Sequence, residues 1–261
     1  MQQLTIITTA GRPDETSKGL AQYASSLLHY EIVERKKRSV AKLQQTYNAN
    51  IIVAGKERYE YFAYGQQEPF FYHPNSAAFR IKRLAKGESE TLIEASQLKA
   101  GDSFLDCTLG IGSDSLVAAF VVGKQGKVVG VEANQNVAFI VQEGMKTYNY
   151  EELPLTACMR DINVVHANAV RYLKDQPSNS FDVVYIDPMF EQVIEESKNF
   201  EALRAAGNHD ALTDEWVSEA KRVAKRCVLL KAHFESPYFQ QFGFHQYVRP
   251  TAKFHYGVIE V

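Results

Sequence analysis

Short apolar runs alternate with amphipathic segments from residue 101 to the end of the chain. The apolar runs are rich in β-branched and aromatic residues, which is typical of buried strands. The first run starts at Phe104, and the others lie at 127–131, 162–166, 181–186 and 227–231. Apolar residues at helical spacing predict helices at 115–122, 134–148, 170–174 and 213–225. This rhythm predicts an α/β fold with a doubly wound, mostly parallel sheet. The last apolar runs, 244–248 and 254–261, are expected to pair as a C-terminal antiparallel hairpin.

The N-terminal part of the chain shows the same alternation on a smaller scale. Strands are predicted at 4–9, 30–34, 50–54 and 58–64, and helices at 14–28 and 40–47. This arrangement predicts a small N-terminal α/β subdomain over residues 1–70. Residues 71–100 are expected to form a connecting basic and aromatic segment with a lead-in helix at 89–98. Residues 101–261 then form the larger domain, with a polar insertion at 149–161.

The composition is that of an ordinary globular protein, with 45% hydrophobic and 23% charged residues. A formal net charge of -2 argues against a protein that coats polyanions without specificity, although it allows a local basic patch. Cys107, Cys158 and Cys227 lack the spacing of a metal site or a disulfide framework, which fits a reducing compartment. No apolar run is long enough to span a membrane, and the first residues lack a signal-peptide pattern. The protein is therefore predicted to be cytoplasmic, with no membrane partner.

A glycine turn follows the first predicted strand of the larger domain, between Asp106 and Asp114. Gly110 and Gly112 allow a tight turn and the close approach of a ligand, although packing alone can also explain such glycines. Glu132 ends the next predicted strand, 22 positions after Gly110, where a carboxylate can accept both hydroxyls of a ribose. The turn and the carboxylate together favour a nucleoside ligand.

The charges around the turn discriminate between nucleoside ligands. A dinucleotide site favours Gly-x-Gly-x-x-Gly, and Ser115 stands where the third glycine belongs. The chain also lacks the Gly-x-x-x-x-Gly-Lys-Ser/Thr motif of triphosphate-binding loops. Asp106 and Asp114 would repel a pyrophosphate, but they suit the sulfonium and amino groups of S-adenosylmethionine (SAM). The sequence therefore predicts SAM as the cofactor.

The tetrapeptide Asp187-Pro188-Met189-Phe190 follows the predicted strand at 181–186. The Asp187 carboxylate and the Pro188 carbonyl can each accept a hydrogen bond from an exocyclic amine, and Phe190 can stack on the base. Because the two acceptors would orient the nitrogen lone pair toward a donor methyl group, positioning matters more than a strong base. The alternative is a proline turn that ends a buried strand. His166 is predicted to be a packed, hydrogen-bonded histidine, and no metal site is predicted.

Two basic clusters are candidates for contact with nucleic acid. One is Arg35-Lys36-Lys37-Arg38, and the other contains Arg80, Lys82 and Arg83 and follows the aromatic-rich stretch 70–79. Basic residues interleaved with aromatic ones can hold a phosphate backbone and stack on bases. The alternative for both clusters is a solvated surface beside core aromatic residues.

The motifs resemble those of class I SAM-dependent methyltransferases, and the resemblance covers roughly residues 100–261. More narrowly, they are similar to the bacterial J-type 16S ribosomal RNA (guanine-N2) methyltransferases. That family has an Asp-Ala-Thr-Ala-Gly-Leu-Gly-Arg-Asp turn and an Asp-Pro-Met-Phe strand end. The matching stretches are the turn from Asp106 to Asp114, Glu132, His166-Ala167-Asn168-Ala169, Tyr185-Ile186-Asp187-Pro188-Met189-Phe190 and Val228-Leu229-Leu230-Lys231.

The resemblance implies a Rossmann-like fold, SAM-dependent methylation of a guanine amine in ribosomal RNA, and the RNA or the small ribosomal subunit as partner. It implies Asp187, Pro188 and Phe190 as catalytic residues. The family's donor site falls on Ser113, Asp114, Glu132, Ala133, Asn168, Ala169 and Asp187. Together with the turn residues Asp106, Thr108, Gly110 and Gly112, these are the predicted cofactor-binding residues. The chain departs from the family at Ser113, where the family has an arginine, and at Asn168-Ala169, where it has a serine pair. Two alternatives stay open: a methyltransferase of small molecules or proteins, and an inert RNA-binding protein with this fold.

Overall fold

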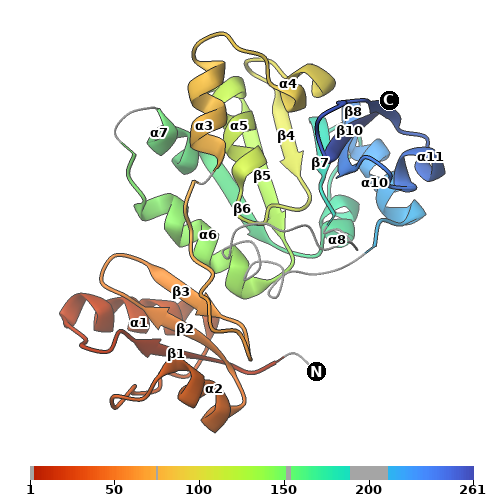
Figure 1. Ribbon diagram of the computed structural model, residues 1–261. Helices are drawn as coiled ribbons and strands as arrows, with labels where there is room; N and C mark the ends of the chain where they lie inside the picture. The colour runs from red at the N-terminus through yellow and green to blue at the C-terminus, as the bar shows by residue number, and fades with distance from the viewer. Residues whose placement is uncertain (1–2, 75, 151–153, 189–210) are drawn as a thin grey trace.

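A computed structural model of the protein describes residues 3–74, 76–150, 154–188 and 211–261. Its larger sheet has the strand order β6-β5-β4-β7-β8-β10-β9 (Figure 1). The strands are β4 (Ser103–Asp106), β5 (Lys127–Glu132), β6 (Ile162–His166), β7 (Phe181–Ile186), β8 (Ala224–His233), β9 (His245–Tyr247) and β10 (Phe254–Glu260). Strands β4 to β8 pair in parallel, and β10 pairs antiparallel with both β8 and β9. The predicted sheet is confirmed, and the predicted C-terminal hairpin forms its antiparallel end.

Helices cover both faces of this sheet because successive strand residues point to opposite faces. Phe104, Val183 and Leu229 pack into one apolar cluster with the helices α3 to α7. Leu105 and Val184 belong to the opposite cluster, which α8, α10 and α11 cover. The helices are α3 (Ser76–Leu84), α4 (Thr91–Ser96), α5 (Ser113–Val122), α6 (Gln135–Thr147), α7 (Leu155–Asp161), α8 (Ala169–Lys174), α10 (Asp214–Val223) and α11 (Tyr238–Phe242). Helices α3, α7 and α11 were not predicted; α3 lies in the expected connecting segment, and α7 lies in the expected polar insertion.

The smaller sheet consists of β1 (Thr5–Thr9), β2 (Asn50–Ala54) and β3 (Tyr59–Phe62), with helices α1 (Glu15–Leu28) and α2 (Val40–Tyr47). Strand β1 pairs in parallel with β2, which pairs antiparallel with β3. The predicted strand at 30–34 is wrong, because only Ile32 forms a bridge, with Ile7. His29 and Lys36 both have positive φ values, so turns close the stretch at both ends before a ladder can form.

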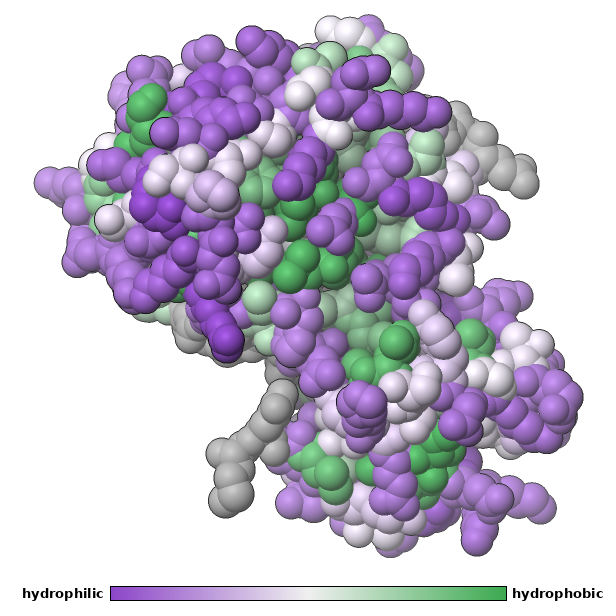
Figure 2. Space-filling model, turned by 180° about the vertical axis from the view of Figure 1, so that it is seen from behind, coloured by the Kyte–Doolittle hydropathy of each residue, from purple (hydrophilic) through white to green (hydrophobic). Residues whose placement is uncertain are grey.

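Helix α6 joins the two sheets. The ring of Phe139 on α6 lies 4.8 Å from that of Tyr59 on β3, and Asn136 donates a hydrogen bond to Thr5 at 3.3 Å. The smaller sheet lies on the side toward which the arrow of β4 points (Figure 1). Seen from behind, the two lobes meet at a narrow waist, and hydrophilic residues cover most of the surface (Figure 2). The smaller sheet is thus placed beside the carboxyl ends of the parallel strands, while the domain boundary at residue 70 stays a prediction.

Candidate functional site

A cleft opens where the carboxyl ends of β4, β5 and β7 meet. It encloses about 510 Å³ when the open space at its mouth is counted. The predicted site residues that line it are Thr108, Gly110, Glu132, Ala133, Asn168, Ala169, Asp187 and Pro188. Cys107, Val131 and Trp216 also line it and were not predicted. Ligands of parallel sheets bind at the carboxyl ends of the strands, and the residues predicted on this basis make up most of the cleft wall.

Glu132 is a buried carboxylate in the wall of this cleft. One carboxylate oxygen accepts the backbone N–H of Gly110 at 3.1 Å, and the other accepts that of Asn134 at 2.8 Å. Burial raises the pKa of Glu132, and these backbone donors oppose the rise. Each oxygen keeps a further lone pair, so the carboxylate can accept the two hydroxyls of a ribose in the cleft.

The two glycines of the turn have different surroundings. Gly110 lines the cleft, whereas Gly112 does not. Gly112 has a φ of +81°, and a Cβ there would lie 2.5 Å from Cε of Met145 and 3.3 Å from Leu109. Gly112 is therefore required by the turn and by packing. Ser113, the next residue, also lies outside the cleft wall, and its buried Oγ has no hydrogen-bond partner among the described residues.

Asp106 stabilises the turn from within. It accepts hydrogen bonds from Oγ of Ser115 at 2.7 Å and from the backbone N–H of Thr108 at 3.0 Å. Burial raises the pKa of Asp106 to about 7. The hydroxyl of Thr108 in turn accepts the backbone N–H of Asp187 at 2.7 Å. The ends of β4 and β7 are thereby fixed side by side, and Asp106 contributes to the cleft without lining it.

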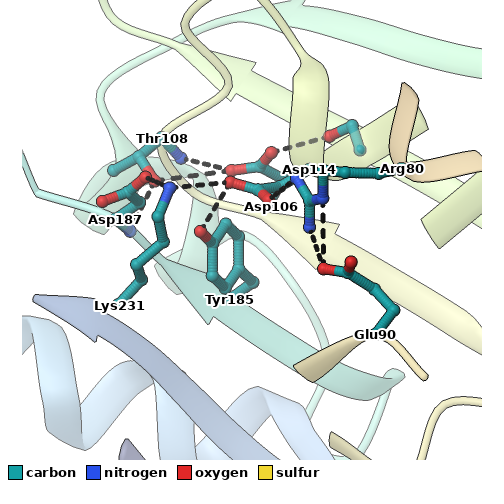
Figure 3. Close-up of polar contacts among 9 residues, drawn as sticks. Arg80, Glu90, Asp106, Thr108, Asp114, Tyr185, Asp187 and Lys231 are labelled. Atoms are coloured by element: carbon teal, nitrogen blue, oxygen red, sulfur yellow. Dashed lines mark hydrogen bonds and ion pairs between the residues drawn. The ribbon is translucent and has the colours of Figure 1, made fainter. Parts of the chain in front are cut away.

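Asp114 is the centre of a buried network of charges, drawn in Figure 3. One carboxylate oxygen lies 2.6 Å from Arg80, and the other accepts the hydroxyl of Tyr185 at 2.8 Å and lies 3.2 Å from Nζ of Lys231. Burial alone would raise the pKa of Asp114, but Lys231 and Arg80 outweigh it and hold that pKa far below its usual range. Asp114 is therefore paired with Arg80 and Lys231 of the protein itself, whereas the sequence analysis expected it to face the positive charges of SAM.

Arg80 lies inside this network, and its side chain is only 18% exposed. It bridges Asp114 and Glu90, each at 2.6 Å. The sequence grouped Arg80 with Lys82 and Arg83 as an RNA-binding cluster, but two carboxylates already occupy its guanidinium group. We therefore correct that assignment and treat Arg80 as a residue that joins α3 to the site.

Replacing Arg80 with methionine is expected to lower the free energy of unfolding by about 3–5 kcal/mol, because Asp114 would lose a partner in the interior. Urea unfolding measures the change. Arg83→Met is the matched control, since Arg83 lies on the same helix and its partner, Glu88, is at the surface. Equal midpoints for the two variants would contradict the assigned role of Arg80.

Asp187 directly follows β7 and lies beside Lys231, which is the second cation of the network after Arg80 (Figure 3). Oδ2 of Asp187 lies 2.7 Å from Nζ of Lys231. Oδ1 is buried and has no hydrogen-bond partner among the described residues. Burial raises the pKa of Asp187, and the charge of Lys231 works against that rise. One oxygen is therefore held by a lysine, while the other is left as an acceptor next to the cleft.

Sequence reasoning found the aspartate but not its lysine partner. Lys231 was noted only within a strand similar to the family's, and nothing in its spacing linked it to Asp187. Trp216 was missed as well, because it follows a long connection from β7. It is buried in the cleft wall, and its indole N–H lacks a partner among the described residues. Phe190 lies outside the described residues.

Other predicted features lie away from these contacts. The prediction of a packed His166 is wrong, because this residue is exposed, although its Nε2 does lie 3.2 Å from the carbonyl oxygen of Ala133. Among the described residues, no group of three or more His, Cys, Asp or Glu side chains is placed to hold a metal ion. Within the same residues, no helix has the length and apolar character needed to cross a membrane.

Comparison with known proteins decides the family. A family model described as "Putative SAM-dependent methyltransferase" matches residues 69–249, which is more than half of the chain. The chain belongs to this family. The methyltransferase is 42% identical over 255 residues to "Uncharacterized protein YpiP" of Bacillus subtilis (strain 168), covering 98% of the chain and 99% of that relative.

More distant relatives of the methyltransferase carry substrate names. It is 30% identical over 165 residues to "Ribosomal RNA small subunit methyltransferase J" of Acinetobacter baumannii (strain AYE), and the match spans 58% of the chain and 57% of that enzyme. The crystal structure of the SAM-dependent methyltransferase NGO1261 from Neisseria gonorrhoeae has a TM-score of 0.61 and 16% identity, covering 97% of this chain and 95% of that one. The likeness to the solved structure concerns the fold alone.

SAM is the cofactor of the methyltransferase, and the cleft fits this molecule. The fit rests on Glu132, which offers lone pairs to a ribose, and on Nε1 of Trp216, a buried donor that has no partner among the described residues. A ligand that reached this donor would remove the cost of leaving it unpaired. The chemistry of the cleft wall and the family therefore agree.

Replacing Glu132 with glutamine is expected to weaken SAM binding about 10- to 100-fold, because hydrogen bonds to a charged acceptor contribute about 1.5–3 kcal/mol. Isothermal titration calorimetry measures the affinity. Glu143→Gln provides the control, since Glu143 is a buried glutamate on α6 that does not line the cleft. An unchanged affinity in Glu132→Gln would exclude Glu132 from the ribose site.

Proposed function

We propose that this methyltransferase transfers the methyl group of SAM to an exocyclic amine of ribosomal RNA, the N2 nitrogen of a guanine. The observation that carries the proposal concerns Oδ1 of Asp187, a buried oxygen that has no hydrogen-bond partner among the described residues. Asp187 and Pro188 both line the cleft that also contains Glu132. An acceptor there suits a substrate that brings N–H groups to the cofactor. A hydroxyl substrate would instead call for a base that removes its only proton.

The proposed roles follow from the geometry of the cleft. SAM supplies a methyl group on a positively charged sulfur. Oδ1 of Asp187 and the carbonyl of Pro188 accept the two N–H groups of the amine, so its lone pair is directed away from both acceptors and into the cleft. As the N–C bond forms, the bond between sulfur and the methyl group would break with its electron pair staying on sulfur, and the positively charged nitrogen would then release one proton, which we propose the Asp187 carboxylate accepts. Phe190 is proposed to stack on the base.

The cofactor is proposed to lie along the strand ends. Glu132 would hold the ribose, and Thr108, Gly110, Ala133, Asn168 and Ala169 would surround the nucleoside. Four further predicted residues do not line the cleft and are proposed to support cofactor binding through the turn, by shaping it or balancing its charge: Asp106, Gly112, Ser113 and Asp114.

Ribosomal RNA as the substrate is supported by the J-type motifs and by the relatives that bear that name. The exposed tip of the turn at 35–38 supports it further. Arg35 and Arg38 donate hydrogen bonds to backbone carbonyl groups of their own turn, and Arg38 also lies over the ring of Tyr47. Lys36 and Lys37 are left exposed at its tip. We propose that these two lysines contact phosphates, and that Lys82 and Arg83 do so as well.

Mass spectrometry of ribosomal RNA nucleosides tests the proposal, using cells with and without the gene. The expected result is the loss of one N2-methylguanosine, restored when the wild-type gene is returned. Restoration should fail with a gene that encodes Asp187→Ala. If the nucleoside profile is identical in all strains, RNA is not the substrate, and a methyltransferase of small molecules or proteins takes its place.

A further inference from the structure

A row of side chains crosses the larger sheet from the catalytic strand to its edge. Lys231 on β8 lies opposite Tyr256 on β10, and Tyr256 lies opposite Tyr247 on β9. Residues that face each other across an antiparallel pair point to the same side of the sheet. Since Lys231 also contacts Asp187 on β7, the row leads from the proposed amine acceptor to the sheet edge. Strands are spaced about 4.8 Å apart, so its ends are about 15 Å apart.

The row leaves the interior as it crosses the sheet. Tyr256 is buried, whereas Tyr247 is 38% exposed. Phe254 and His233 form the next opposed pair on the same face, and both are partly exposed. The ring of Phe254 lies 5.9 Å from Nζ of Lys231. Phe234, at 44% exposure, follows His233, and their rings are 4.6 Å apart. We call the four exposed or partly exposed rings the aromatic platform: His233, Phe234, Tyr247 and Phe254.

A buried histidine holds the platform in shape. The ring of His255 is 2.8 Å from the side-chain amide of Gln246, which also donates to the backbone carbonyl of Phe234 at 2.9 Å. The other ring nitrogen lies 3.1 Å from the backbone of Arg249. The backbone N–H of Phe234 donates to Lys253 at 3.0 Å. These contacts fix the tip of the hairpin before any ligand arrives, which lowers the entropy cost of binding.

Positive charge borders the platform. Arg249 and Lys253 lie in the connection between β9 and β10, and both are exposed. Rigid exposed rings next to cationic side chains form the usual combination for single-stranded nucleic acid, because bases stack on the rings and phosphates meet the cations. Lysine is depleted at protein–protein interfaces, whereas it commonly contacts phosphates of nucleic acids, and Lys253 adjoins Phe254 of the platform.

We propose that the aromatic platform binds the unpaired nucleotides next to the target base, with stacking on its rings and phosphate contacts at Arg249 and Lys253. This inference rests on the proposed function. It places a second RNA contact on the opposite end of the molecule from Lys36 and Lys37, and it predicts that the target lies in a single-stranded stretch. The row through Lys231 then links nucleotide binding to the acceptor at Asp187.

Fluorescence anisotropy with a labelled single-stranded RNA of mixed sequence tests the platform. Phe234→Ala and Tyr247→Ala are each expected to weaken RNA binding about tenfold, since a base stacked on an aromatic ring contributes about 1–3 kcal/mol. Arg249→Ala should lower the steepness of the salt dependence. Tyr64→Ala is the control, because Tyr64 is an exposed ring outside the platform. SAM affinity, measured by calorimetry, should equal that of the wild type in every variant.

The outcomes separate the platform from the proposed function. If the wild type methylates ribosomal RNA and the platform variants bind RNA as Tyr64→Ala does, the platform inference is overturned while the proposed function stands. The same result would be found if the platform served a protein partner. If the wild type neither binds nor methylates RNA, both fail together. Thermal unfolding checks each variant, and selective loss of RNA binding in a folded variant supports the platform.

Discussion

Methyl transfer by Asp187→Ala is expected to fall at least about 100-fold below that of the wild type, with SAM affinity nearly unchanged. The variant removes the buried acceptor, so the amine can bind with its lone pair turned away from the methyl group. Misplacement of a reacting group by about 1 Å is enough for a loss of this size. Transfer of tritium from labelled SAM to RNA measures the rate, and calorimetry measures the affinity.

Asp182→Ala is the matched control for this variant. Asp182 also lies on β7, but at the amino end of the strand, where it accepts hydrogen bonds from Ser103 and pairs with Lys225 at 3.6 Å. Like Asp187→Ala, the Asp182→Ala variant removes a carboxylate, but Asp182 does not line the cleft. A wild-type transfer rate in Asp187→Ala would mean that the amine finds its acceptor elsewhere.

Lys231→Met is expected to move the acid limb of the pH–rate profile to higher pH and to lower kcat about 100-fold at neutral pH. Lys231 favours the ionised form of Asp187, so its loss raises the pKa of that carboxyl further. A protonated Asp187 is a poorer acceptor, and activity therefore requires a higher pH to appear. The sign is opposite to that expected if Lys231 were itself a base.

Lys225→Met is the control for Lys231→Met. Both lysines lie on β8 and pair with an aspartate of β7, but Lys225 is at the other end of the strands. Lys231→Arg keeps the charge and should restore the acid limb, even if its bulkier head group lowers kcat. A profile in Lys231→Met that coincides with that of Lys225→Met would contradict the role given to Lys231.

The sequence predicted the sheet and the cleft wall for a simple reason. The strands are short apolar runs, and polar residues that directly follow them must meet at one edge when the strands are parallel. Glu132 and Asp187 were found in this way, and the structure places both in the same cleft.

The charge network could not be predicted in the same way, because its partners are distant along the chain. Asp114 and Arg80 are 34 positions apart, and Lys231 and Asp187 are 44 apart. One local signal did exist for Arg80. Helix α3 buries Ala77 and Ile81, and Arg80 is three residues from the first and next to the second, so it borders the buried face. A cluster of basic residues on a helix therefore has to be divided by face before it is assigned to a ligand.

The alternating charges of Glu90, Arg80, Asp114, Lys231 and Asp187 also limit how this protein can diverge. A neutral replacement of Arg80, Asp114 or Lys231 alone would leave an unpaired charge in the interior. The loss of two neighbouring residues of opposite charge would instead leave the net charge of the network unchanged. Evolutionary change at these positions should therefore be inherited in compensating pairs. Among diverging copies of this gene, Arg80 and Asp114 should disappear together, while Lys231 persists for as long as Asp187 is needed.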